Sequence, residues 1–258
     1  MPQNHEESVD VLIRTFNSAD TLENCLESVT RYIPVKRILI ADHNSTDATP
    51  EIAARFSVEL FEEEKGLGYA TNLLISKAST KYVLFVDGDV SVVSDTFFAQ
   101  AMEEFKDPRT GAVVGCALGH NFLYGIPLGL TMMPLQLARK INMPDEIQGR
   151  ETFYFEEVIS DNYLKIRYVK DAMIHRSVYR NYRYWPEWQG AQIRMTPSRH
   201  FSQLSKAIIV VWMMHLNSKN AKNFLYSPIY YLKLLTGFMN PTKWGKIDRR
   251  KISGEVHR

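Results

Sequence analysis

The sequence has little cysteine, no long hydrophobic run and no apolar leader. Cys25 and Cys116 are the only cysteines in 258 residues, too few for a disulfide framework or a four-ligand zinc site. Both lie in apolar patterns, which predicts buried, reduced thiols. No uncharged segment approaches the roughly 20 residues that a membrane-spanning helix needs. Residues 1–8 are polar and lack the apolar core of a signal peptide. These absences predict a protein that stays in the cytoplasm.

A strong excess of either charge is also missing, because 31 Lys and Arg stand against 29 Asp and Glu. This near balance argues against a general nucleic-acid-binding protein. Residues 241–258 nevertheless contain six basic and two acidic residues, which leaves a net charge of −2 on the first 240. A basic end on a mildly acidic body predicts contact with an anionic surface, such as the inner face of the cell membrane.

What the sequence does contain is a regular alternation of strand and helix patterns over residues 9–90. The first helical stripe is Leu22, Cys25, Leu26 and Val29, spaced i, i+3, i+4, i+7. Such alternation with short loops predicts an α/β fold with a mostly parallel sheet covered by helices on both faces. The predicted strands are 9–14, 37–41, 58–61 and 82–86.

The last of these strands ends in Asp87-Gly88-Asp89. Two carboxylates after an apolar strand are costly unless water or a cation compensates them. Ligands bind at the carboxyl ends of strands in open α/β sheets, so this pair could hold a divalent cation that clamps a diphosphate. An acidic turn is an equally good interpretation of the motif alone, because Asp-Gly is common in turns.

Further motifs in a fixed order make residues 9–90 similar to the nucleotide-sugar half of the family 2 glycosyltransferases, which have the GT-A fold. The resemblance is marked over about a third of the chain and fades afterwards. It implies a GT-A domain at 1–203, with the nucleotide-sugar half at 9–90 and the acceptor half at 91–203, and a helical, basic C-terminal segment at 204–258. The motifs are Arg14-Thr15-Phe16-Asn17, Asp42-His43-Asn44-Ser45-Thr46-Asp47, Gly66 with Asn72, and Asp87-Gly88-Asp89.

The resemblance also implies roles for particular residues. The first loop and Asp42 would contact the base, while Asp87 and Asp89 would bind ribose and the metal-diphosphate, with Mg²⁺ or Mn²⁺ on Asp89. The implied nucleotide-sugar site is Thr15, Phe16, Asn17, Asp42, Gly66, Asn72, Asp87 and Asp89.

Two of these motifs have alternative interpretations. The Asp42 carboxylate could accept the imide N–H of uracil, or it could cap its own loop together with Asn44 and Ser45; Asp47 is assigned to capping. Residues 65–68 contain Gly-x-Gly, but Thr71 stands where a dinucleotide-binding loop has its third glycine. The segment also follows the third strand, which excludes a Rossmann oxidoreductase.

The reaction would also need a general base, because an acceptor hydroxyl loses its proton as it attacks the anomeric carbon. The resemblance implies an acid after a glycine at a helix start, followed by a strand that leads to a histidine. Glu151 fits this pattern, although Thr152 stands where a second acid would be. His175 would approach the metal or diphosphate, unless it is a structural histidine. The rival acids are Asp145, Glu146, Glu156 and Glu157.

The C-terminal segment has a short apolar helix pattern before its basic end. Ser227 and Pro228 predict its start and Pro241 its end. About twelve residues would span only about 18 Å, too little to cross a bilayer. With Lys233 and Gly237 in a narrow non-apolar stripe, the pattern predicts a helix on an anionic membrane surface, with a buried docking helix as the alternative.

Together these features predict inverting transfer of a sugar from a nucleoside diphosphate sugar, preferably a UDP-sugar, to a glycan or lipid-linked acceptor. Two alternatives remain open from the sequence. One is a synthase that attaches a sugar to a polyprenyl phosphate, whose anionic acceptor needs no strong base. The other is a catalytically silent nucleotide-binding module.

Overall fold

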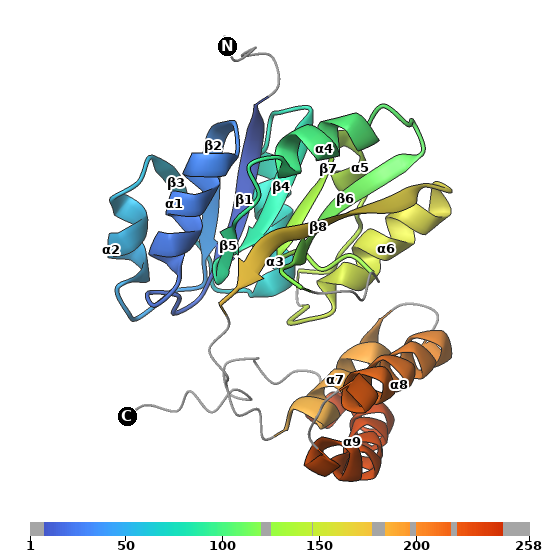
Figure 1. Cartoon of the computed structure of the whole chain (residues 1–258). Helices are drawn as coiled ribbons and strands as arrows, with labels where there is room; N and C mark the ends of the chain where they lie inside the picture. Colours follow the sequence, from blue (N-terminus) through green and yellow to red (C-terminus); the bar gives the residue numbers. More distant parts are fainter. Residues whose placement is uncertain are drawn as a thin grey trace. The chain divides into compact units, whose positions relative to one another are not determined.

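The computed structural model describes residues 8–119, 125–145, 147–176, 184–196, 200–217 and 221–244. It divides into two compact units, one made of residues 1–147 and 151–178 and the other of residues 148–150 and 179–258. We call them the sheet unit and the helical unit (Figure 1). Glu146 and most of the basic end, residues 245–258, lie outside the described residues.

The first half of the sheet unit follows the predicted alternation. Its strands pair in parallel in the order β3-β2-β1-β4. This arrangement confirms the predicted parallel half, since each strand is followed by a helix that returns the chain to the same edge. The elements are β1 (Val9–Thr15), α1 (Leu22–Tyr32), β2 (Val35–Asp42), α2 (Thr49–Ala54), β3 (Val58–Glu62), α3 (Leu67–Lys77) and β4 (Tyr82–Asp87).

The second half completes an eight-stranded sheet of order β3-β2-β1-β4-β7-β6-β8-β5. Strand β7 runs antiparallel to both β4 and β6, and β5 runs antiparallel to β8. The sequence did not predict β7, because its residues 130–133 are all buried and therefore show no alternation. The elements are β5 (Val90–Val92), α4 (Phe97–Glu104), β6 (Thr110–Ala117), β7 (Leu130–Pro134), α5 (Leu135–Ala138), α6 (Glu151–Asp161) and β8 (Lys165–His175).

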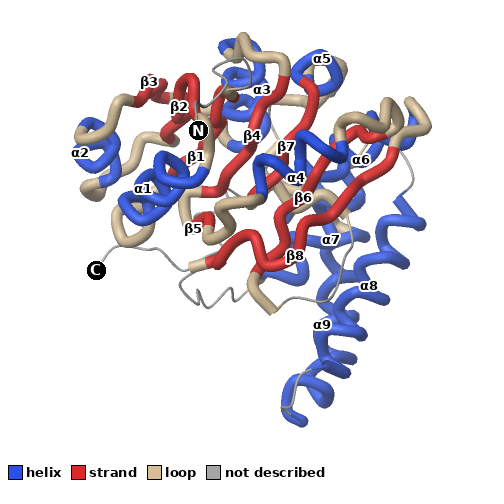
Figure 2. The backbone as a smooth tube through the Cα atoms, turned by 45° about the horizontal axis from the view of Figure 1, so that its top comes forward, coloured by secondary structure: helices blue, strands red, loops and turns tan. Residues whose placement is uncertain are grey.

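Helices cover both faces of this sheet (Figure 2). Strand β1 shows the reason: Val11 and Ile13 face the apolar cluster of α1 and α4, whereas Leu12 faces the cluster of α3 and α6. Side chains alternate across a strand, so a continuous apolar run such as β1 is buried from both sides.

The helical unit contains α7 (Trp185–Met195), α8 (His200–Asn217), α9 (Ala221–Met239) and α10 (Pro241–Trp244). The predicted helix end before Asn240 is correct, but the predicted start at Ser227 is wrong, because α9 begins at Ala221 and contains Pro228. Pro228 has no N–H to donate within the helix, but the helix still extends to residues before it. None of the helices that the structure describes is both long and apolar enough to cross a membrane.

Close packing of α7 on α9 explains where the two units divide. A Cβ atom added at Gly190 would lie 1.9 Å from the Leu234 carbonyl oxygen, and one at Gly237 would lie 1.7 Å from that of Glu187. The helix backbones therefore meet at two glycines. The aromatic segment around α7 groups with the C-terminal helices, and the sheet unit extends to residue 178.

Candidate active site

The predicted site residues converge because parallel strands end at one edge of the sheet. Thr15 is in register with Asp42, and Arg14 is in register with Asp87. His175, the last residue of β8, pairs with Val90 of β5, which follows Asp89 directly. Segments separated by up to 160 residues thus bring their side chains to one place.

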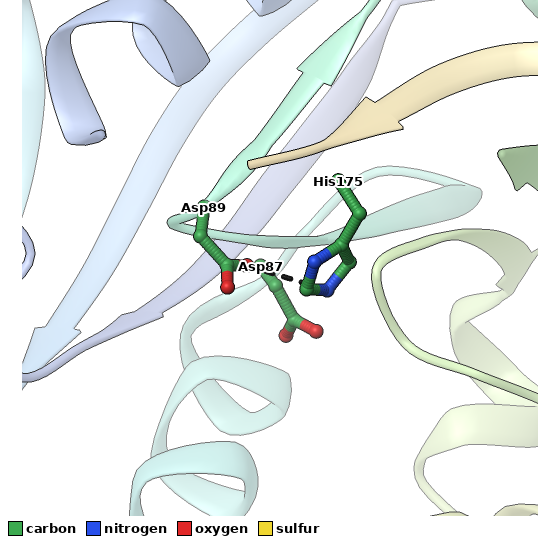
Figure 3. Close-up of side chains that lie close together, drawn as sticks. All are labelled: Asp87, Asp89 and His175. Carbon is green, nitrogen blue, oxygen red and sulfur yellow. Dashed lines mark ion pairs between the residues drawn. The ribbon is translucent and has the colours of Figure 1, made fainter. Parts of the chain in front are cut away.

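Asp87, Asp89 and His175 form a cluster at this edge (Figure 3). One ligand atom from each lies within 4.8 Å of the others, and Nε2 of His175 is 3.6 Å from Oδ1 of Asp89. Two carboxylates and an imidazole are a suitable donor set for a divalent cation such as Mn²⁺. All three are at least partly exposed, so the cluster is open to a ligand.

Arg14, for which the sequence predicted no role, connects this cluster to Glu151. Its Nη2 donates to Oδ1 of Asp87 at 2.6 Å, and its Nη1 lies 3.3 Å from Oε1 of Glu151 and 3.4 Å from the Thr71 hydroxyl. Burial lowers the pKa of Arg14, but the two carboxylates outweigh this effect and raise it overall. The sequence feature that could have pointed to Arg14 is that it is the single arginine in an apolar strand.

Glu151 begins α6, as the sequence predicted, and its side chain is mostly buried beside Arg14. Among its rivals, Asp145 accepts a hydrogen bond from the Asn72 amide at 3.0 Å. Glu156 and Glu157 lie within α6, one to two turns beyond Glu151. Of these acids, the structure pairs only Glu151 with Arg14 in the part of the chain that it describes.

Asn72 and Gly68 contact the segment that leads to Glu151. The Asn72 amide also donates to the Met143 carbonyl oxygen at 2.8 Å. The Gly68 N–H donates to Ile147 at 2.9 Å, and a Cβ at Gly68 would lie 2.3 Å from the Pro144 oxygen. Gly66 has φ +106°, a conformation that favours glycine. The start of α3 therefore packs against residues 143–145 and 147.

Asp42 is 1% exposed and its carboxylate is fully engaged within the protein. Its Oδ1 accepts the Thr15 and Ser45 hydroxyls at 2.6 and 2.7 Å, and its Oδ2 accepts the Ser45 N–H at 2.7 Å. This geometry favours the capping alternative over a direct contact with a base. Asp47 accepts the Thr49 N–H at the start of α2, consistent with a cap.

A hydrogen bond and a ring contact join the loops after β1 and β2. Asn17, at φ +45°, accepts the Thr46 N–H at 2.9 Å. The Phe16 ring lies edge-on to His43, with centroids 5.8 Å apart. Nδ1 of His43 lies 2.6 Å from Oε1 of the buried Glu63. The sequence predicts no pairing of His43 with Glu63, because that pairing depends on the β2–β3 register.

Comparison with known proteins gives related enzymes. An alignment over 117 residues, which covers 42% of this chain, is 32% identical to poly-β-1,6-N-acetyl-D-glucosamine synthase of Staphylococcus epidermidis. Another alignment over 97 residues, which covers 35% of the chain, is 33% identical to cholesterol galactosyltransferase of Borreliella burgdorferi. The chain matches only 28% and 27% of the lengths of these relatives.

Solved structures share the fold. Mannosyltransferase PcManGT of Pyrobaculum calidifontis, in complex with GDP-Man and Mn²⁺, has a TM-score of 0.63 at 17% identity, over 93% of this chain and 76% of that one. Glucosyl-3-phosphoglycerate synthase of Mycobacterium tuberculosis, in complex with Mn²⁺ and UDP, has a TM-score of 0.55 at 16% identity, over 67% and 73%. These likenesses confirm the predicted GT-A fold.

The family model described as glycosyl transferase family 2 matches residues 10–182, which include most of β1, the Asp87-Gly88-Asp89 turn, Glu151 and His175. The chain therefore belongs to glycosyl transferase family 2.

Proposed function

We propose that this chain transfers a sugar from a nucleoside diphosphate sugar to an acceptor, with inversion at the anomeric carbon. The observation that carries the proposal is the meeting of an Asp87-Asp89-His175 cluster with a mostly buried acid, Glu151, at one edge of the sheet. A donor site and a base must be adjacent for a single displacement. The complexes of the structural neighbours with GDP-Man or UDP support this class of donor.

On the donor side, Asp89 and His175 would hold Mg²⁺ or Mn²⁺, which would stabilise the diphosphate as it leaves. Asp87 gives Oδ1 to Arg14 and keeps Oδ2 for the ribose or the ion. Phe16 and Asn17 would border the base. Asp42 would not contact the base itself. It would support the site indirectly, because it accepts hydrogen bonds from Thr15 and Ser45 and so fixes the two loops.

On the acceptor side, Glu151 would take the proton of the attacking hydroxyl. Its Oε1 faces Arg14, which leaves Oε2 for the acceptor. A phosphate acceptor is already anionic, so a synthase acting on a polyprenyl phosphate would need no such base. The alternative acceptors therefore differ in how strongly the rate depends on Glu151.

The test is a panel of UDP-, GDP- and dTDP-sugars with and without Mn²⁺. We expect one nucleotide to raise the melting temperature, and to do so more with the metal, because ligands that bind the native state stabilise it. The same radiolabelled donor should then be hydrolysed slowly or transferred. Binding without any turnover would leave the silent module as the better proposal, and no binding by any donor would contradict both.

We further propose that the helical unit meets an anionic membrane that carries the acceptor. One side of α9 packs on α7 through Leu234, Gly237 and Phe238. The other side leaves Leu232 66% and Met239 74% exposed. The wider exposed apolar set on α8 and α9 is Phe201, Ile209, Trp212, Ile229, Leu232, Leu235 and Met239.

The charges of the helical unit favour an anionic membrane as the partner of these exposed apolar side chains. Between Glu187 and Asp248 the chain has eight Lys and Arg and no acidic residue. Exposed apolar side chains among exclusively positive charges suit the surface of an anionic leaflet, where each Lys or Arg contributes about 1 kcal/mol. Two residues of the predicted non-apolar stripe face α7 and not the exposed side of α9. Lys233 pairs with Glu187 of α7, and Gly237 is buried against the same helix.

A further inference from the structure

Arg14 is placed so that three different elements reach it. It shares a face of β1 with Leu12, which packs in the cluster of α3 and α6. Thr71 of α3, Asp87 of β4 and Glu151 of α6 all contact its guanidinium. Because the side chain is only 9% exposed, these partners replace the water that a charged group would otherwise need.

The two ends of the guanidinium serve different parts of the proposed reaction. Nη2 binds Asp87 of the donor cluster, while Nη1 faces Glu151, the proposed base, 137 residues away in the sequence. A planar fork with separate donors can hold two carboxylates at a fixed separation, whereas a lysine ammonium is a single point charge. One side chain thus contacts both the donor cluster and the proposed base.

We propose that Arg14 is a positioning residue that fixes Glu151 relative to the donor site. The inference rests on the proposed function and adds a residue to it. Arg14 does not touch the reacting atoms; it acts through Glu151. Loss of the fork should leave the donor bound but the base misplaced, and a misplacement of about 1 Å can cost about 100-fold in rate.

The chain offers a matched control at the other end of the same strand. Arg37 of β2 holds Asp10 of β1 through two hydrogen bonds of 3.1 and 2.7 Å, and its Nη1 lies 3.3 Å from Glu59. Asp10 is fully buried. Arg37 therefore also joins two carboxylates across neighbouring strands, but away from the Asp87 cluster. Any purely structural cost of replacing such an arginine by lysine should appear there too.

The experiment compares R14K, R37K, E151Q and the double variant R14K/E151Q in donor turnover, donor KM and thermal stability. We expect R14K to lower kcat about 100-fold with a donor KM within about threefold. R37K should lose stability but keep kcat within about twofold. In the E151Q background, R14K should reduce kcat less than about threefold further, because both changes disable one unit.

Three results would overturn the inference: a near-normal kcat in R14K, a donor KM that rises in proportion to the loss of rate, or an equal loss in the E151Q background. Should R14K not fold, Thr71→Val removes the hydroxyl that contacts the same Nη1. It should lower kcat several-fold at constant donor KM, and an unchanged kcat would again count against Arg14. Lack of turnover in the unmodified chain would defeat the proposed function itself, whereas turnover with a normal R14K defeats only the inference.

Discussion

At the scale of single residues, burial separates the acids that support the site from those that can meet a ligand. Asp42 is 1% exposed and accepts three hydrogen bonds, whereas the Asp87 and Asp89 side chains are 36% and 34% exposed. A saturated, buried carboxylate has little left to offer a nucleotide. We therefore expect Asp87 and Asp89, at the end of β4, to bind the ligand, and Asp42 to hold the loop after β2 in place.

Asp89→Asn should abolish Mn²⁺-dependent turnover and the extra thermal stabilisation by donor plus Mn²⁺, while the fold persists. The amide keeps the shape but loses the charge that a hard cation requires, and the side chain is too exposed for its loss to unfold the sheet unit. Titration calorimetry with Mn²⁺ and thermal melts measure both effects. Asp95→Asn, at an exposed site beyond β5, is the control. Full activity of Asp89→Asn, or of the unmodified chain in EDTA, would refute the metal site.

At the scale of elements, the residues just before α6 pack within the helical unit. Residues 148–150 belong to the helical unit, where a Cβ at Gly149 would lie 2.1 Å from the buried Trp188 ring and Arg150 donates to Gln203 at 2.7 Å. Arg150 has φ +59°, a strained value for a residue with a side chain. Glu151, the proposed base, is the next residue in the chain after Arg150.

The crossing of α7 and α9 provides a test at the same scale. In a free helix Gly237→Ala would be stabilising by roughly 1 kcal/mol. Here the added methyl would collide with the Glu187 backbone, so we expect a net loss of about 1–3 kcal/mol. Denaturant unfolding measures it, with Thr236→Ala, at the exposed neighbouring position, expected to change stability little. An increase in stability for Gly237→Ala would mean that the two helices do not approach so closely.

At the scale of the whole molecule, the chain combines two units of different character. The family match ends at residue 182, close to where the helical unit takes over. The sheet unit carries the proposed chemistry, and the helical unit carries the exposed apolar face and a net positive charge. This division predicts that surface binding and catalysis can be disturbed separately.

Liposome flotation tests the membrane proposal. We expect binding to vesicles that contain phosphatidylglycerol, no binding to neutral vesicles, and loss of binding as salt rises, because the attraction is screened. Leu232→Glu should abolish binding and spare donor turnover, whereas Ser76→Glu, on the exposed side of α3, should bind normally. Truncation at Ser227 is unsuitable because it would cut α9. Equal binding of neutral vesicles, or normal binding by Leu232→Glu, would contradict the proposal.

Local patterns in the sequence were sufficient for much of this protein. The period-2 and period-3.6 patterns predicted the parallel half and its helices, and the rule that ligands bind at strand ends pointed to Asp87 and Asp89. Glu151 and His175 followed from the family resemblance, and the structure places them at a helix start and a strand end near the same edge. Such features depend on a few neighbouring residues, so they can be read without tertiary contacts.

Tertiary structure decided the features that depend on distant partners. The fork of Arg14 joins residues 73 and 137 positions away, and the burial of Asp42 follows from the packing of two loops. Strand β7 is buried on both faces and so has no pattern to recognise, and α9 runs through a proline that looked like a start. Gly237 faces α7, and only the packing of the two helices shows which side of α9 is buried. Sequence therefore determined which groups reach the edge of the sheet, and packing determined which of them remain available there.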